Sequence, residues 1–274
     1  MNTRFVIALR NEVRKGLRFA WSERLQILIE LPMFAAFIVL LGPLLGQGKQ
    51  VDTGAVNWSL GSQTTSAMIV WFVPFIFFYL QVVKMFWRLL GEIQTGTIEQ
   101  VYLSPLPSWL VAAAGRVLAA LVETLVVAAG TYGIVSAFVT IHLHWTIAAV
   151  LPAVMVMAAA VGLSLIIAGA TVVYKRIQLV NDTVLLLVML FSASAVPLIG
   201  VPGWWRAASH AFPLTDGVGS LYNVMLAHRP VTTAWGIGGL VPLLAISTGY
   251  LLAGILVFRL GERIAKRRGT VGRY

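Results

Sequence analysis

Long apolar runs alternate with short polar segments along most of the chain. A helix rises about 1.5 Å per residue, so about 20 apolar residues cross a hydrocarbon core about 30 Å thick. Runs of this kind lie at about 25–46, 62–88, 108–140, 145–174, 183–199 and 233–258. The pattern predicts an all-α polytopic membrane protein with six transmembrane helices, in a single domain that covers residues 25–274.

Residues 1–24 precede these runs and have an amphipathic pattern. An apolar residue recurs at every fourth position, and a parallel basic stripe lies about 100° further round the helix. The apolar residues are Phe5, Leu9, Val13, Leu17 and Trp21, and the basic ones are Arg10, Arg14 and Arg18. Such a helix lies in the headgroup plane with its arginines toward anionic lipid. We interpret the segment as an interfacial helix rather than a signal peptide, because further apolar runs follow and no small-residue cleavage site is evident after Gly46.

A polar segment, residues 91–107, separates the second and third runs. Lys84 and Arg88 lie one helical turn apart just before it, which marks this side of the membrane as cytoplasmic. Gly91 and Gly96 loosen the backbone. We therefore expect the helix of the second run to end near Arg88 and the polar segment to face the cytosol.

The local chemistry of this segment predicts a short helix of about two turns. Thr97 followed by Gln100 fits a capping box, and the prolines in 104–107 stop the helix, because a residue before proline leaves the helical region. The polar side of this helix carries Glu99, Gln100 and Tyr102, and Ile98 and Val101 can anchor another side. A tight cytoplasmic turn without a partner is the alternative.

Residues 201–230 stay apolar between several prolines and polar residues. The segment is too interrupted to cross a bilayer, and free backbone in lipid is costly unless protein shields it. We expect two short re-entrant helices that dip into the membrane from outside, between the fifth and sixth spans. A plain extracellular loop is the alternative.

Three charged residues lie within or near the predicted spans. Glu30 is expected near the interface or paired with a basic residue, with a transport role as the alternative. Arg116 lies near the inner interface, where its side chain can snorkel to water. Glu123 lies deeper and needs a partner, because a charge at that depth is expensive. A structural contact with a neighbouring span is one interpretation of Glu123, and a substrate or proton role is another.

The faces of two runs indicate how the spans pack or what they bind. One helical face of the second run is aromatic, and it is either a path for an amphipathic or ring-bearing substrate or a lipid-facing or packed face. This face carries Trp71, Phe75, Phe78 and Tyr79. Small residues in the fourth run allow close helix approach. These are Ala158, Gly162, Ala168 and Gly169.

Composition agrees with the membrane class. Hydrophobic residues make up 59% and charged residues 11% of the chain, against roughly 45–50% and 25% in soluble domains. The net charge is +10, but the basic residues cluster beside the apolar runs and no nucleic-acid motif is present. Anionic membrane lipids are therefore the expected partners of this charge, and nucleic acid is not.

The same basic residues set the orientation. All of them except Lys49, Arg206 and Arg229 fall in segments on one side of the six runs, including a basic tail at 259–274. Basic residues favour the cytoplasmic side, so we expect both termini to be cytoplasmic.

Several kinds of site are missing from the sequence. It has no cysteine, which excludes disulfides and thiolate metal sites. No phosphate-binding glycine-rich loop and no local nucleophile signature occur. His142 and His144 alternate but have no nearby carboxylate or cysteine, so we interpret them as interfacial rather than as metal ligands. We expect no catalytic residue, no metal site and no bound cofactor in this chain.

The polar segment and its surroundings resemble the permease subunits of type-2 ABC exporters. Glu92, Gly96–Thr97, Glu99 and Ser104–Pro105 look like the pattern Glu-(x)n-Gly-Thr-x-Glu-(x)n-Ser/Thr-Pro that follows the second span in that family. The resemblance implies that this segment carries a coupling helix that docks on a separate ATPase subunit. The residues expected to make this contact are Glu92, Gly96, Thr97, Glu99, Gln100 and Tyr102.

The resemblance also implies the larger assembly. Two permeases, as a homodimer or a heterodimer, would sit on two ATPase subunits that bind ATP and Mg, in the plasma membrane of a bacterium. The exported substrate would be a drug, an antibiotic, a lipid or a glycan. A secondary transporter or channel without an ATPase is the alternative, although such proteins often show paired halves and no clear internal repeat is found.

Overall fold

The computed structural model describes residues 3–46, 62–97, 112–174, 177–191, 202–229 and 238–268, and nearly all of these residues are helical. No strand occurs within these ranges. Among the described residues, four helices are long and apolar enough to cross a membrane, namely Ser66–Gln94, Gly115–Phe138, Ile147–Tyr174 and Leu240–Arg268. An all-helical polytopic membrane protein is therefore confirmed, and the total of six spans stays a prediction.

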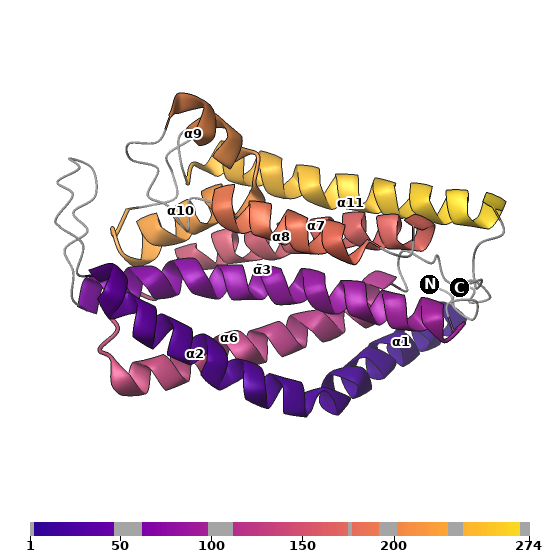
Figure 1. The fold of residues 1–274 in the computed structure, drawn as a ribbon, viewed down its shortest axis with the longest axis horizontal. Helices are drawn as coiled ribbons and strands as arrows, with labels where there is room; N and C mark the ends of the chain where they lie inside the picture. Colours follow the sequence, from indigo (N-terminus) through magenta and orange to yellow (C-terminus); the bar gives the residue numbers. More distant parts are fainter. Residues whose placement is uncertain are drawn as a thin grey trace.

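The N-terminal part of the chain forms two helices that meet at an angle (Figure 1). Helix α1 spans Thr3–Ser22, and α2 spans Arg24–Gly46. Glu23 lies at the turn between them. The break between the two helices falls within two residues of the predicted boundary, and the place of α1 in the headgroup plane stays a prediction.

Helix α3 spans Ser62–Gln94 and extends beyond its predicted end near Arg88. The prediction was wrong because Gly91 stays helical. Leu89, Leu90 and Ile93 are buried around it, and burial of such side chains outweighs the roughly 1 kcal/mol that a glycine costs inside a helix. The helix ends just before Gly96, whose φ of 71° is the left-handed conformation that glycine adopts readily.

The third and fourth apolar runs also form long helices. A π-helical stretch η1, Ala112–Val117, leads into α6, Leu118–Phe138. A short 3₁₀ turn η2, Ile147–Ala149, leads into α7, Val150–Tyr174. Both helices agree with the predicted runs, except that residues 108–111 lie outside the described ranges.

The fifth run begins earlier than predicted. Helix α8 spans Gln178–Phe191, so it starts five residues before the predicted Thr183. An apolar run could not reveal this start because Asn181 and Asp182 are polar. Asn181 is nonetheless buried, and its Nδ2 donates to Asp182 Oδ1 at 3.2 Å. Residues 192–199 of the predicted run lie outside the described ranges.

Two short helices follow, α9 at Gly203–His210 and α10 at Pro213–Met225, and then α11 at Leu240–Arg268. The two short helices are those expected within 201–230. Nearly all of α10 is buried, so protein shields its backbone. Helix α11 continues ten residues past the predicted end at Phe258, because Gly261 and Ala265 are buried against the bundle and extend its inner face.

The helices lie lengthwise and side by side, so the bundle has two distinct ends (Figure 1). Helix α1 begins at one end, where α3 and α11 finish, and α11 finishes there with Lys266, Arg267 and Arg268. We call this the basic end. Helices α9 and α10 lie at the opposite end (Figure 1).

Helix α3 lies at the centre of the packing. Its side chains enter the largest hydrophobic cluster together with residues of α2, α6, α7 and α10. Ile76, Phe78 and Phe86 of α3 are almost completely buried. A helix with little free surface cannot move alone, so displacement of α3 must carry its neighbours with it.

Helices α7 and α11 run parallel, and their backbones are in close contact. A Cβ at Gly162 would overlap the backbone of Tyr250, and a Cβ at Gly169 would lie 2.8 Å from the Cα of Phe258. On α11, Gly254 and Gly261 pack in turn against these two glycines. The glycines are seven residues apart on each helix, so they lie on one face. Close approach at Gly162 and Gly169 was predicted and is confirmed.

Candidate functional site

The last three turns of α3 carry a charged face. Lys84, Arg88 and Glu92 are four residues apart and so point to one side of the helix. Lys84 and Arg88 are only 4% and 6% exposed. Buried charges need partners, and two groups of carboxylates and cations provide them.

The first group, which we call the inner cluster, consists of Glu23, Glu30, Lys84, Arg88 and Glu123. Glu123 of α6, 1% exposed, forms ion pairs with Arg88 and with Lys84, whose Nζ is 3.4 Å from its Oε2. The predicted need of Glu123 for a partner on a neighbouring span is confirmed. Its alternative role in a substrate path stays a prediction.

The inner cluster also includes the turn between α1 and α2. Arg88 Nη2 lies 2.9 Å from Glu23 Oε2, and Lys84 Nζ lies 3.4 Å from the same oxygen. Lys84 Nζ is also 3.5 Å from Glu30 Oε1 on α2, and Gln26 Nε2 donates to that oxygen at 2.8 Å. The pairing of Glu30 with a basic residue is thus confirmed. Three carboxylates share two cations, and these contacts join α2, α3 and α6.

The second group, which we call the outer pair, lies closer to the basic end. Glu92 of α3 forms an ion pair with Arg116 of η1, and Lys15 Nζ of α1 is 3.6 Å from Glu92 Oε1. Arg116 is 7% exposed, so the prediction that it snorkels to the interface was wrong. The reason is the carboxylate of Glu92, which offers Arg116 a partner within the protein.

Helix α1 crosses η1 beside the outer pair, where Gly16 contacts Gly115. A Cβ at Gly16 would overlap the carbonyl of Gly115, so the two backbones touch where α1 crosses η1. The crossing leaves no room for a side chain at Gly16. Lys15, next to Gly16, and Arg116, next to Gly115, contact different carboxylate oxygens of Glu92.

Part of the predicted coupling segment is described. Glu92 and Thr97 are linked, because Thr97 Oγ1 donates to the Glu92 carbonyl at 3.4 Å, and Gly96 provides the bend between them. The side chain of Glu92 points to Arg116 and Lys15 of the same chain. Glu99, Gln100 and Tyr102 lie outside the described residues, and so does the predicted short helix.

The predicted aromatic face packs along α3. Trp71 stacks on Phe75 at 6.5 Å between ring centroids, and Phe75 lies 6.1 Å from Tyr79. Phe75 and Phe78 are buried in the largest hydrophobic cluster, and Trp71 and Tyr79 are half-buried. In the single chain these residues form a packed face, and a substrate path along it stays a prediction.

Sequence reasoning missed Glu23, Lys15 and the specific partners of each buried charge. The spacing of Lys84, Arg88 and Glu92 was the signal that was available. Three charges on one face at the end of an apolar helix imply facing charges on other helices. Which helices face them depends on packing, which a single sequence does not contain.

The opposite end is joined by hydrogen bonds around Asp216 of α10. Asp216 is 1% exposed, accepts from the backbone N–H of Gly238 at 3.2 Å, and lies 3.0 Å from His210 Nδ1 of α9. Ser220 Oγ donates to the Gly238 carbonyl at 2.7 Å. These contacts connect both short helices to the segment that leads into α11.

A metal site does not form among the described residues. The rings of His144 and His228 lie 4.9 Å apart, but no group of three or more ligating side chains occurs in the part of the chain that the structure describes.

Comparison with known proteins adds the family. The model of a family described as "ABC-2 type transporter" matches residues 48–226, which is more than half of the chain. No curated protein matches the chain. The matched region begins before α3 and ends after α10, so it includes the inner cluster residues of α3 and α6. It also includes Glu92 and Arg116 of the outer pair, whereas Lys15 lies before it. The chain therefore belongs to the ABC-2 type transporter family, as a multi-pass membrane permease.

Proposed function

We propose that this permease is the transmembrane subunit of an ATP-driven exporter and that a separate ATPase docks at its basic end. The observation that carries the proposal is the outer pair. Glu92 precedes the segment 98–111 and Arg116 follows it, so their ion pair links the two stretches of chain that flank this segment. A force on the segment is therefore transmitted to α3 and η1 together.

The inner cluster supports the same transmission. Lys84 and Arg88 connect α3 to the α1–α2 turn, to α2 and to α6. The attraction between opposite charges is stronger in a medium of low dielectric than in water. Movement of the end of α3 thus moves α2 and α6 as well, rather than bending α3 alone.

In the proposed complex, Thr97, Glu99, Gln100 and Tyr102 contact the ATPase, and two ATPase subunits hold ATP and Mg. Two permeases, identical or homologous, enclose the substrate path between them. Both termini are cytoplasmic, and α9 and α10 form the gate on the outer side of a bacterial plasma membrane. The substrate is amphipathic, as a drug, a lipid or a glycan conjugate is, because such a molecule can enter from the inner leaflet and reach the aromatic face of α3.

The proposal is tested by expressing the chain with candidate ATPases and measuring co-purification in mild detergent, then substrate-stimulated ATP hydrolysis. Thr97→Arg and Glu99→Arg are expected to insert normally and to lose stimulation. Thr140→Arg, two residues after the end of α6 and exposed, is the control and should keep this stimulation. Wild-type stimulation and export in both segment variants would exclude the coupling role, and flux through the purified chain without any ATPase would favour a secondary transporter or channel.

A further inference from the structure

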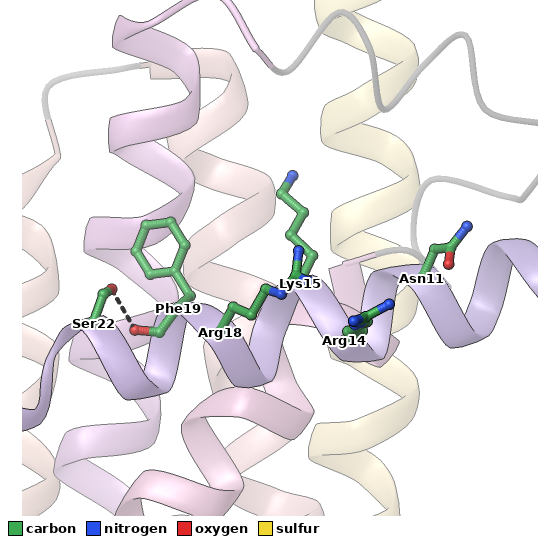
Figure 2. A pocket seen from close by; sticks show the side chains of 6 residues that line it. All are labelled: Asn11, Arg14, Lys15, Arg18, Phe19 and Ser22. Carbon is green, nitrogen blue, oxygen red and sulfur yellow. Dashed lines mark hydrogen bonds between the residues drawn. The ribbon is translucent and has the colours of Figure 1, made fainter.

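A basic pocket lies along α1. It has a volume of about 400 Å³ and is lined by Asn11, Arg14, Lys15, Arg18, Phe19 and Ser22. Each of these residues has another of them three or four positions away, so they share one side of the helix. Figure 2 shows Asn11, Lys15, Phe19 and Ser22 rising from that side with Arg14 and Arg18 beside them. The pocket is open and its charged groups are cationic.

The two arginines of this pocket differ from the cations of the ion-pair groups. Within the described residues, Arg14 and Arg18 have no carboxylate within ion-pair distance, whereas Lys84, Arg88 and Arg116 all do. Lys15 belongs to both the pocket and the outer pair, because it lines the pocket and its Nζ lies 3.6 Å from Glu92 Oε1. A ligand with negative charge would satisfy Arg14 and Arg18 without disturbing another contact.

The geometry of the donors favours a phosphate group. A guanidinium offers paired N–H donors that match phosphate oxygens, and two guanidinium groups one turn apart can hold one such group from two sides. The amide of Asn11 adds a neutral donor at the same side of the helix. The pocket therefore has the chemistry of a site for a phosphate monoester or diester.

The surface beside the pocket is apolar and indicates what the phosphate is attached to. Trp21 is 71% exposed, and the α2 residues that follow the pocket, Leu25, Leu28 and Ile29, are 65–70% exposed. Exposed apolar patches mark surfaces that contact another protein or a membrane, and next to an amphipathic basic helix we infer that the partner is lipid tails. A ligand that fits both surfaces carries an anionic phosphate next to long apolar chains.

We propose that the α1 pocket binds the headgroup of an anionic phospholipid, with Arg14 and Arg18 on the phosphate and the acyl chains along the exposed face of α2. Lys15 then lies between the phosphate and Glu92, so lipid binding is adjacent to the outer pair. The proposal needs only a membrane around the chain and is independent of the substrate, the direction of transport and the ATPase.

The experiment uses the purified, delipidated full chain in a neutral detergent and measures thermal stabilisation during titration with dioctanoyl phosphatidylglycerol. The test variant is Arg14→Gln/Arg18→Gln. The control is Arg267→Gln/Arg268→Gln, which removes two positive charges from exposed positions of α11. We expect the half-saturating lipid concentration to rise at least about tenfold in the test variant, as loss of a charge-assisted hydrogen bond implies. In the control it should stay within about twofold.

Parallel titrations separate the lipid from other sources of the same charge. Dioctanoyl phosphatidylcholine, which has no net charge, and inorganic phosphate should each stabilise the wild type far less. Equal stabilisation by phosphatidylcholine would overturn headgroup recognition, and equal stabilisation by inorganic phosphate would replace the lipid by a free anion. Equal weakening in both double variants would reduce the site to general surface charge.

A folding defect is separated from a binding defect by the lipid-free melting temperature, which should match the wild type because both arginines are exposed. Arg14→Lys/Arg18→Lys keeps the charge but loses the paired donors, so we expect intermediate binding. Wild-type affinity in Arg14→Gln/Arg18→Gln would overturn the proposal.

Discussion

Buried charges of the inner cluster are stable only as a group. Glu123 is almost inaccessible to solvent, and its partners Arg88 and Lys84 are themselves shared with Glu23. Removing one partner from a buried ion pair leaves an uncompensated charge, which is worse than removing both partners. The inner cluster is therefore expected to lose more stability when one charge is removed than when an opposite charge is removed with it.

Arg88→Met should lower the free energy of unfolding by about 3–5 kcal/mol, because it leaves Glu123 and Glu23 with Lys84 alone. Arg88→Met/Glu123→Met should recover part of this loss. Thermal unfolding of the detergent-solubilised chain measures both effects, with Arg263→Met on the exposed side of α11 as the control. A double variant less stable than Arg88→Met would contradict the ion-pair explanation.

The outer pair is suited to a charge-swap test in the complex with the ATPase. Arg116→Glu places two carboxylates side by side and should reduce substrate-stimulated ATP hydrolysis about tenfold, equivalent to roughly 1.4 kcal/mol. Glu92→Arg/Arg116→Glu restores opposite charges and should recover much of the activity. Lys15→Gln, which removes only the half-exposed third partner, is the milder control. Failure of the swap to recover any activity would show that the pairing itself is not what matters.

At the scale of single elements, α3 joins features that were expected in two segments, the second apolar run and the polar segment after it. It provides the aromatic packed face, the cations of the inner cluster and Glu92 of the outer pair. The prediction that it stops near Arg88 missed this, since a glycine at 91 suggests an end unless the burial of Leu89, Leu90 and Ile93 is known. Continuity of the helix is what connects the predicted coupling segment to the bundle.

The contact between α7 and α11 gives a second prediction for an element. Gly169→Val would place methyl groups against the backbone of Phe258, and overpacking of this kind costs about 1–3 kcal/mol or more. Gly249→Val on α11 is the matched control because its added Cβ meets nothing within 4 Å. We expect a clear fall in melting temperature and in yield for Gly169→Val alone. Equal losses in both variants would indicate helix propensity rather than packing.

For the molecule as a whole, the sequence alone predicted those features that depend on neighbouring residues or on the membrane environment. Hydrophobic run length predicted the long helices, and the expense of charge in lipid predicted that Glu30 and Glu123 have partners. The sequence did not predict features that depend on which helices pack together. Arg116 was expected to reach the interface because nothing in the sequence shows that Glu92 lies beside it, and the start of α8 was hidden by the polar residues Asn181 and Asp182.

The glycine contact between α7 and α11 also has a consequence for biosynthesis. The ribosome completes α7 before it makes α8, α9 and α10, and only then α11. At about 5–20 residues per second, Gly169 waits on the order of ten seconds for Gly261. During that interval the glycine face of α7 lacks the helix that it contacts in the finished fold. Slowing translation after α7 should therefore prolong the exposure of this face and increase degradation of the chain.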